Sequence, residues 1–205
     1  QQIEPRTDLA KVDGVFLASM HRITEPGSYY LSGNIDVTAF HGIEIAASGV
    51  TLDLNGFSLF RSSTDASAGA AILINTKNLS NIVIKNGHIT SGVTFRSTID
   101  GDQFTGSGFD SGIREDTVFS PDNVRVSHVH ISGCNIDGIN LGPSVSNTIE
   151  YCSVEVAGSV GIRAGGVHHS TAINCGSTGI FATGNVSHCY ATSSGSNGIL
   201  SGGNV

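Results

Sequence analysis

Short stretches of alternating hydrophobic and polar residues fill most of the chain, and they recur at a nearly constant spacing. A small polar turn followed by Gly-Ile marks each repeat: NIDGIN at 135–140, GSVGIR at 158–163, GSTGIF at 176–181 and GSNGIL at 195–200. The four glycines are 23, 18 and 19 residues apart. A repeat of roughly 20 residues is too short for a helix-pair solenoid and is typical of β-solenoids or leucine-rich repeats.

Aligning the chain on these Gly-Ile pairs places aliphatic residues in columns. The first column holds Ile43, Ile72, Ile113, Ile139, Ile162, Ile180 and Ile199. A second holds Ile84, Val126, Ile149, Val167 and Val186, and a third holds Leu59, Ile89, Ile131, Val154, Ala172 and Ala191. Period-2 stretches separated by Gly, Asn and Ser indicate strands and turns. The L-x-x-L-x-L pattern of leucine-rich repeats is absent.

These columns predict an all-β fold, a right-handed parallel β-helix of about seven coils with loop insertions. Successive coils stack at the ~4.8 Å spacing of neighbouring strands, and parallel crossovers are right-handed. We assign residues 1–30 to an N-terminal entry or capping segment and residues 31–205 to the β-helix. A repeat of this kind favours one continuous body.

Two N-terminal segments carry a resemblance to a known family. ITEPGSYYLSGNI at 23–35 and GIEIAASGVTLDLNGFSL at 42–59 resemble the entry segment of secreted β-helix proteins of the pectate-lyase-like superfamily. That superfamily includes lyases, glycoside hydrolases, epimerases, tailspikes and noncatalytic adhesins, so the resemblance implies carbohydrate as a ligand without naming a reaction. The Gly-His-Gly motif of polygalacturonases and the Trp-Ile-Asp-His segment of pectate lyases are absent.

Insertions interrupt the repeat beside the first column. RSSTDASAGAA at 61–71 and a longer excursion between Ile89 and Ile113 leave from one side, while 115–122 and 142–147 leave from the other. Glu115 occupies a core position, so we expect the strand to end there. Because long insertions on a regular scaffold are usually functional or mobile, we expect a groove along the middle coils.

The residue after each inward isoleucine faces outward into this groove. Arg114, Asn140, Arg163 and Phe181 would therefore stand one coil apart, about 4.8 Å per step. The planar guanidinium suits a carboxylate such as that of a uronic acid. Arg96 on the long insertion is a further candidate for substrate binding.

Acidic residues near the groove are candidate ligands of a hard cation such as Ca²⁺. They are Asp100, Asp102, Asp110 and Asp116. The resemblance implies a lyase mechanism in which Arg114 or Arg163 takes the proton and the cation neutralises the uronate. The alternative, which we favour, is that these residues are solvated loop carboxylates and surface arginines.

A column of rings lies on another strand: His128, Tyr151, His169 and His188, with His130 two residues after the first. His128 and His130 are candidates for holding a sugar or, as paired imidazoles, a transition metal. We favour a structural role, because stacked rings stabilise adjacent strands.

Composition limits the partners. The formal charge of −7 disfavours nucleic acid, which needs clustered Lys and Arg, and no apolar run approaches the ~20 residues of a membrane span. Four cysteines fall in two columns, with the partners in each column two coils apart. That separation of roughly 9–10 Å exceeds disulfide range, so four free thiols are expected.

The sequence therefore predicts a secreted or cell-surface protein that binds, and in one alternative cleaves, an acidic polysaccharide. The other alternative is a noncatalytic structural or adhesive β-helix. In three core rows the side chains become smaller toward the C-terminus, and open strand edges invite pairing. We expect the C-terminal coil to be covered by another subunit or by chain that follows residue 205, and we favour a homo-oligomer formed through this coil.

Overall fold

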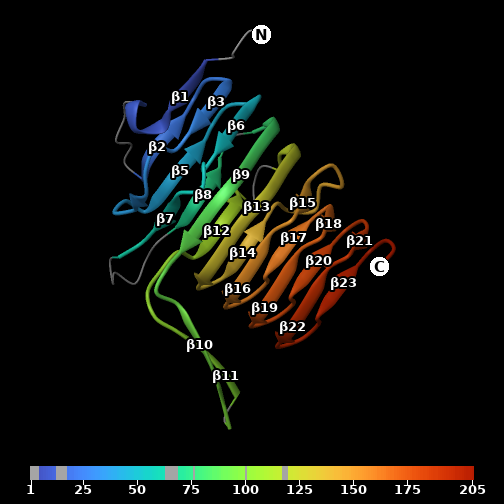
Figure 1. Cartoon of the computed structure of the whole chain (residues 1–205). Coiled ribbons are helices and arrows are strands. Elements are labelled where there is room, and N and C mark those ends of the chain that lie inside the picture. The colour runs from blue at the N-terminus through green and yellow to red at the C-terminus, as the bar shows by residue number, and fades with distance from the viewer. Residues whose placement is uncertain (1–4, 13–17, 63–68, 76, 100, 117–119) are drawn as a thin grey trace.

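The protein is a right-handed parallel β-helix, as the repeat predicts, with successive coils stacked from the N-terminus to the C-terminus (Figure 1). A computed structural model describes residues 5–12, 18–62, 69–75, 77–99, 101–116 and 120–205. Two long parallel sheets form the body, which we name the isoleucine sheet and the bent sheet.

The isoleucine sheet has eight parallel strands in this part of the chain. They are β2 (Ser19–Ile23), β5 (His41–Ile45), β8 (Ala70–Ile74), β12 (Ser111–Glu115), β14 (Asp137–Asn140), β17 (Ile162–Ala164), β20 (Ile180–Ala182) and β23 (Ile199–Ser201). Their register pairs each isoleucine of the first predicted column with the next, from Ile43 to Ile199. The column is confirmed, and β2 adds a strand before it.

The bent sheet has thirteen described strands in two halves. The first half is β1 (Arg6–Asp8), β3 (Gly27–Tyr30), β6 (Val50–Asp53), the start of β9 (Ser80–Thr90), the start of β13 (Asp122–Cys134), β15 (Thr148–Glu150), β18 (Gly166–His168) and β21 (Val186–Ser187). The second half is β4 (Ile35–Asp36), β7 (Ser58–Phe60), the ends of β9 and β13, β16 (Ser153–Ala157), β19 (Thr171–Cys175) and β22 (Tyr190–Ser194). Its register confirms the second and third columns.

The bend between these halves is made by residues with left-handed backbone. Asn86 (φ 59°) and His128 (φ 54°) turn β9 and β13, and Tyr151, His169 and His188 hold the same position in later coils with φ between 48° and 53°. Asn and His accept this conformation more readily than most residues, whereas the β-branched residues of the core columns do not. The ring column is therefore also the column of backbone bends.

The glycine before each isoleucine has a packing reason. A Cβ added to Gly138 would lie 2.5 Å from the carbonyl oxygen of Gly161 and would also overlap the Val154 side chain of the core. Gly161 meets the next coil in the same way, through Gly179. Because this glycine has no Cβ, the corner of each coil can pack closely against the next coil and against the core.

The cysteines are four free thiols, as predicted. Burial raises the pKa of Cys134 and of Cys152 to about 12, so both stay protonated and unreactive at neutral pH. They fill core space as small apolar side chains.

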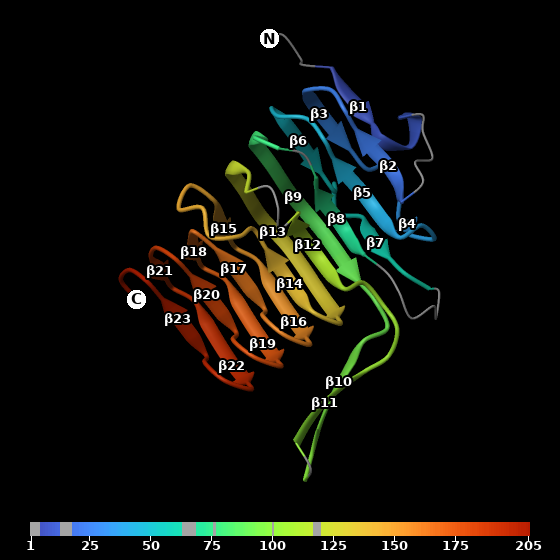
Figure 2. The same ribbon diagram turned by 180° about the vertical axis from the view of Figure 1, so that it is seen from behind.

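The long insertion forms an antiparallel hairpin, β10 (Thr94–Thr98) with β11 (Gly101–Thr105), which extends from the body (Figures 1 and 2). The rings of Phe95 and Phe104 lie 5.3 Å apart, and a Cβ on Gly176 would lie 3.1 Å from Phe104, so the hairpin passes this later coil. Phe109, at its end, is fully buried. The long insertion therefore contributes a buried ring to the core at Phe109.

Helical structure in the described residues is confined to one 3₁₀ turn, η1 (Leu9–Lys11). No helix among these residues is long and apolar enough to cross a membrane.

Candidate functional site

The outer face of the isoleucine sheet carries the predicted row. Register pairs Leu73 with Arg114, Arg114 with Asn140, Asn140 with Arg163, and Arg163 with Phe181. Each of these steps is one strand, so Arg114 and Arg163 stand two strands, or about 10 Å, apart. An extended ligand along the helix axis would meet one of these side chains on every coil.

Both arginines offer unused donors. The Nε atoms of Arg114 and Arg163 are buried, and neither donates a hydrogen bond to the described residues. The Arg163 guanidinium lies over the Phe181 ring, 4.7 Å from its centroid, which holds the plane of the fork in one orientation. A buried donor without a partner calls for an explanation, and a bound acceptor is one.

Glu115 lies beside this row with a buried carboxyl group. It ends β12 as expected, and it pairs with Ile74 in a column that is otherwise aliphatic apart from Ser201 on the last strand. Its side chain lies against Gly142, whose φ of 65° suits glycine and whose missing Cβ leaves the space that the carboxyl group fills. Oε2 accepts no hydrogen bond from the described residues.

Burial is the main cause of the perturbed titration of Glu115. It raises the pKa to about 7; the nearby Arg163 guanidinium opposes the rise and Asp116 adds to it. Because a group with a pKa close to 7 is present in both protonation states at neutral pH, Glu115 can donate or accept a proton there. Perturbed carboxyl groups of this kind mark candidate sites.

A second buried polar group lies at the N-terminal end of the row. Glu44 accepts hydrogen bonds from the Ser19 hydroxyl and from Asn75, each at 2.9 Å. The Ala70 N–H donates to Nδ1 of His41 at 2.9 Å. Burial lowers the pKa of His41, and Arg114 lowers it further, against the opposite effects of Glu44 and Asp116. The imidazole is therefore neutral at pH 7 and carries its proton on Nε2.

The loop 142–147 forms one flank of the row. Asn147 is fully buried; its side chain donates to the carbonyl oxygens of Pro121 and Leu141, and it accepts from the N–H of Val124. The loop also reaches a later coil, where the Thr183 hydroxyl donates to the Pro143 carbonyl at 3.0 Å. This flank is held by hydrogen bonds from three coils.

Other predicted residues lie elsewhere. Arg96 and Asp102 are on the exposed hairpin, where Asp102 accepts from Ser97 at 2.8 Å. Asp110 precedes β12 and Asp116 follows it, so the strand separates them. Asp100 lies outside the described residues. No three His, Cys, Asp or Glu side chains that the structure describes gather as metal ligands, and the Ca²⁺ site stays a prediction.

His128 and His130 are on the bent sheet rather than the isoleucine sheet. The predicted stacking is confirmed: ring centroids are 5.0 Å apart for His128 and Tyr151, 4.8 Å for Tyr151 and His169, and 4.6 Å for His169 and His188. The structure therefore divides the candidates between two faces.

The sequence analysis did not predict that Glu115 and His41 are buried groups with shifted pKa values. For Glu115 the sequence did show a carboxylate at a core position, but we took this only as the end of a strand. Comparison with family models, curated proteins and solved structures found no match.

Proposed function

We propose that the protein is a secreted or cell-surface β-helix of the pectate-lyase-like type that binds an acidic polysaccharide along the outer face of the isoleucine sheet. The observation that carries this proposal is the row of Arg114, Asn140, Arg163 and Phe181 on four consecutive strands. Two guanidinium groups with unused Nε donors suit carboxylates repeated along a polymer.

Cleavage is the further step of the proposal. In a lyase reaction a base removes the proton beside the uronate carboxylate, and cationic groups stabilise the developing enolate. Arg114 or Arg163 would act at this position, as the family resemblance implies. Glu115, with its pKa near 7, is the neighbouring group suited to return a proton to the leaving oxygen.

Binding is tested by titrating polygalacturonate and alginate into the full chain, with neutral dextran as the control. Binding of the polyuronates alone, weakened by salt, supports the proposal; no binding to any polyuronate refutes it. Appearance of unsaturated uronide absorbance separates a lyase from a binding protein. Loss of binding in EDTA, restored by Ca²⁺, would support a cation held by the acidic residues.

The alternative is a noncatalytic β-helix that self-associates through its C-terminal coil. In the described chain β23 is an edge strand of the isoleucine sheet, with Leu200 43% exposed; a second copy of the chain, or further chain after residue 205, would cover it. Sedimentation at several concentrations would detect the oligomer. A monomer whose final coil resists hydrogen exchange would refute this alternative.

A further inference from the structure

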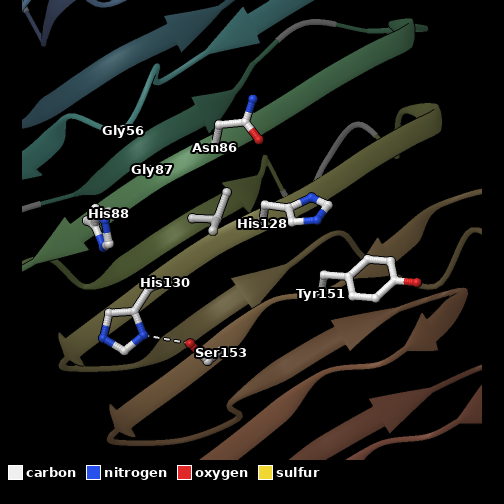
Figure 3. Close-up of a pocket in the computed structure, with 9 residues that line it drawn as sticks. Gly56, Asn86, Gly87, His88, His128, His130, Tyr151 and Ser153 are labelled. Atoms are coloured by element: carbon white, nitrogen blue, oxygen red, sulfur yellow. Dashed lines mark hydrogen bonds between the residues drawn. The ribbon is translucent and has the colours of Figure 1, made fainter.

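A cavity of about 350 Å³ lies at the bend of the bent sheet, away from the arginine row (Figure 3). Polar and ring side chains line it: Asn86, His88, His128, His130, Tyr151 and Ser153. Its volume is in the range of small-molecule sites. The polysaccharide proposal makes no use of this cavity.

One wall is the open end of the ring stack. His128 is the first ring of the stack and lies nearly parallel to Tyr151, at 17°. On the preceding coil the same position holds Asn86, whose amide donates to Asp53 Oδ1 at 3.2 Å. Because that side chain bonds to the coil before it, the ring face of His128 toward Asn86 borders the cavity.

The opposite wall offers imidazole groups. The rings of His88 and His130 meet edge to face with centroids 6.0 Å apart, and Nδ1 of His130 lies 2.6 Å from the Ser153 hydroxyl oxygen. A neutral imidazole carries one N–H and a protonated one carries two. Among the described residues that line the cavity there is no Asp or Glu, so this wall favours an acceptor or an anion.

A metal ion is the competing occupant of a site with three imidazoles. Among the described residues no three His, Cys, Asp or Glu side chains are arranged to hold one. Figure 3 shows the reason: His88 and His130 lie together, and His128 lies apart beside Tyr151. The arrangement therefore favours a ligand long enough to touch both walls.

We propose that this cavity binds a small aromatic carboxylate, with its ring stacked on His128 and its carboxylate directed to His88 and His130. The ligand ring would continue the stack by one position, on the coil where Asn86 replaces a ring. The stack spacing of 4.6 to 5.0 Å matches the strand spacing, so each coil has room for one ring. This site is independent of the polysaccharide site.

The first test is a titration of the full chain with benzoate, followed through the histidine side-chain NMR signals. Cyclohexanecarboxylate keeps the charge without the flat ring, and benzyl alcohol keeps the ring without the charge. We expect benzoate to shift the signals of His88, His128 and His130. Both analogues should bind at least about tenfold more weakly than benzoate. Equal binding of cyclohexanecarboxylate, or no binding of benzoate, would overturn the proposal.

The second test compares the two ends of the stack. His128→Ala should weaken benzoate binding by about tenfold, and His128→Phe should restore it by supplying a ring. His188→Ala is the matched control, because His188 ends the same stack with a similar φ of 52° but does not line the cavity. An equal loss in His188→Ala would show that the effect comes from the fold and would overturn the site.

The third test addresses the competing occupant. In this test Zn²⁺ is titrated into the full chain with and without benzoate. If Zn²⁺ shifts the NMR signals of the same three histidines more strongly than benzoate does, and prevents benzoate from binding, the cavity is a metal site and the proposal is wrong. Polyuronate binding should be unchanged by His128→Ala, so failure at one site is distinguishable from failure at the other.

Discussion

The carboxyl group of Glu115 occupies the space that a side chain on Gly142 would fill. The two residues belong to neighbouring coils: Glu115 ends β12, and Gly142 lies two residues after the end of β14. A carboxyl group at a position that is aliphatic in most other coils can be accommodated because the facing residue has no Cβ. Burial there in turn raises the pKa of Glu115 to about 7. Glycine at position 142 is therefore needed both for the turn and for the placement of the Glu115 carboxyl group.

Gly142→Ala should destabilise the protein through both steric effects. A left-handed alanine costs roughly 1–2 kcal/mol, and displacement of Glu115 adds to this cost. Gly56→Ala is the control, because Gly56 has a φ of 80° with no atom near the added Cβ. Urea unfolding should show a larger loss for Gly142→Ala, and the excess should disappear in a Glu115→Ala background. Equal losses would contradict the contact.

Glu115→Gln should change how stability depends on pH. The folded pKa of about 7 exceeds the ordinary value of ~4.3, so the folded state binds more protons between these values. The contribution of Glu115 to stability is then fully present below pH 4.3 and is lost as pH rises to about 7. In the variant this decrease in the free energy of unfolding, on the order of 3 kcal/mol, should be absent.

Urea unfolding at pH 4.5 and pH 8 measures that difference. Glu155→Gln, at an exposed carboxyl group on β16, is the control and should keep the native pH dependence. A variant with the native pH dependence would show that Glu115 titrates as an ordinary carboxyl group.

The coil register could be predicted from the sequence because each coil repeats the same requirement. An isoleucine at Ile139 and at Ile162 meets the same neighbours, so the pattern is reinforced by every repeat. The placement of Arg114 and Arg163 on one face follows from that register alone. Where the chain departs from repetition, as at the hairpin, no column constrains it, and the burial of Phe109 was missed.

The backbone bend at the histidines was harder to predict than their place on a strand other than that of the arginines. A left-handed residue turns the strand there, so His128 and His130 line a cavity at the bend. Period-2 alternation specifies inward or outward direction but does not specify backbone bends. The environment of the Glu115 carboxyl group could not be predicted either, because it depends on contact with Gly142 of the next coil.

Phe109→Ala should be strongly destabilising although the residue belongs to the long insertion. Phe109 is fully buried, and removal of a buried aromatic ring costs about 3–5 kcal/mol. Phe104→Ala should cost much less, because Phe104 is only half-buried on the otherwise exposed strand β11. Denaturant midpoints compare the two variants, and equal losses would mean that the hairpin is as much a part of the core as Phe109.

Arg163→Ala should weaken polyuronate binding with little change in stability. The half-buried side chain gives up one stacking contact with Phe181, which contributes about 0.5–1 kcal/mol. Arg163→Lys keeps the charge but loses the planar fork, so its affinity should fall between those of the native protein and Arg163→Ala. Arg125→Ala, at an exposed arginine of the bent sheet, is the charge-matched control and should bind normally. Calorimetric titration and thermal unfolding of the four proteins measure both effects. Unchanged affinity in Arg163→Ala, or an equal loss in Arg125→Ala, would remove Arg163 from the site and leave only nonspecific charge attraction.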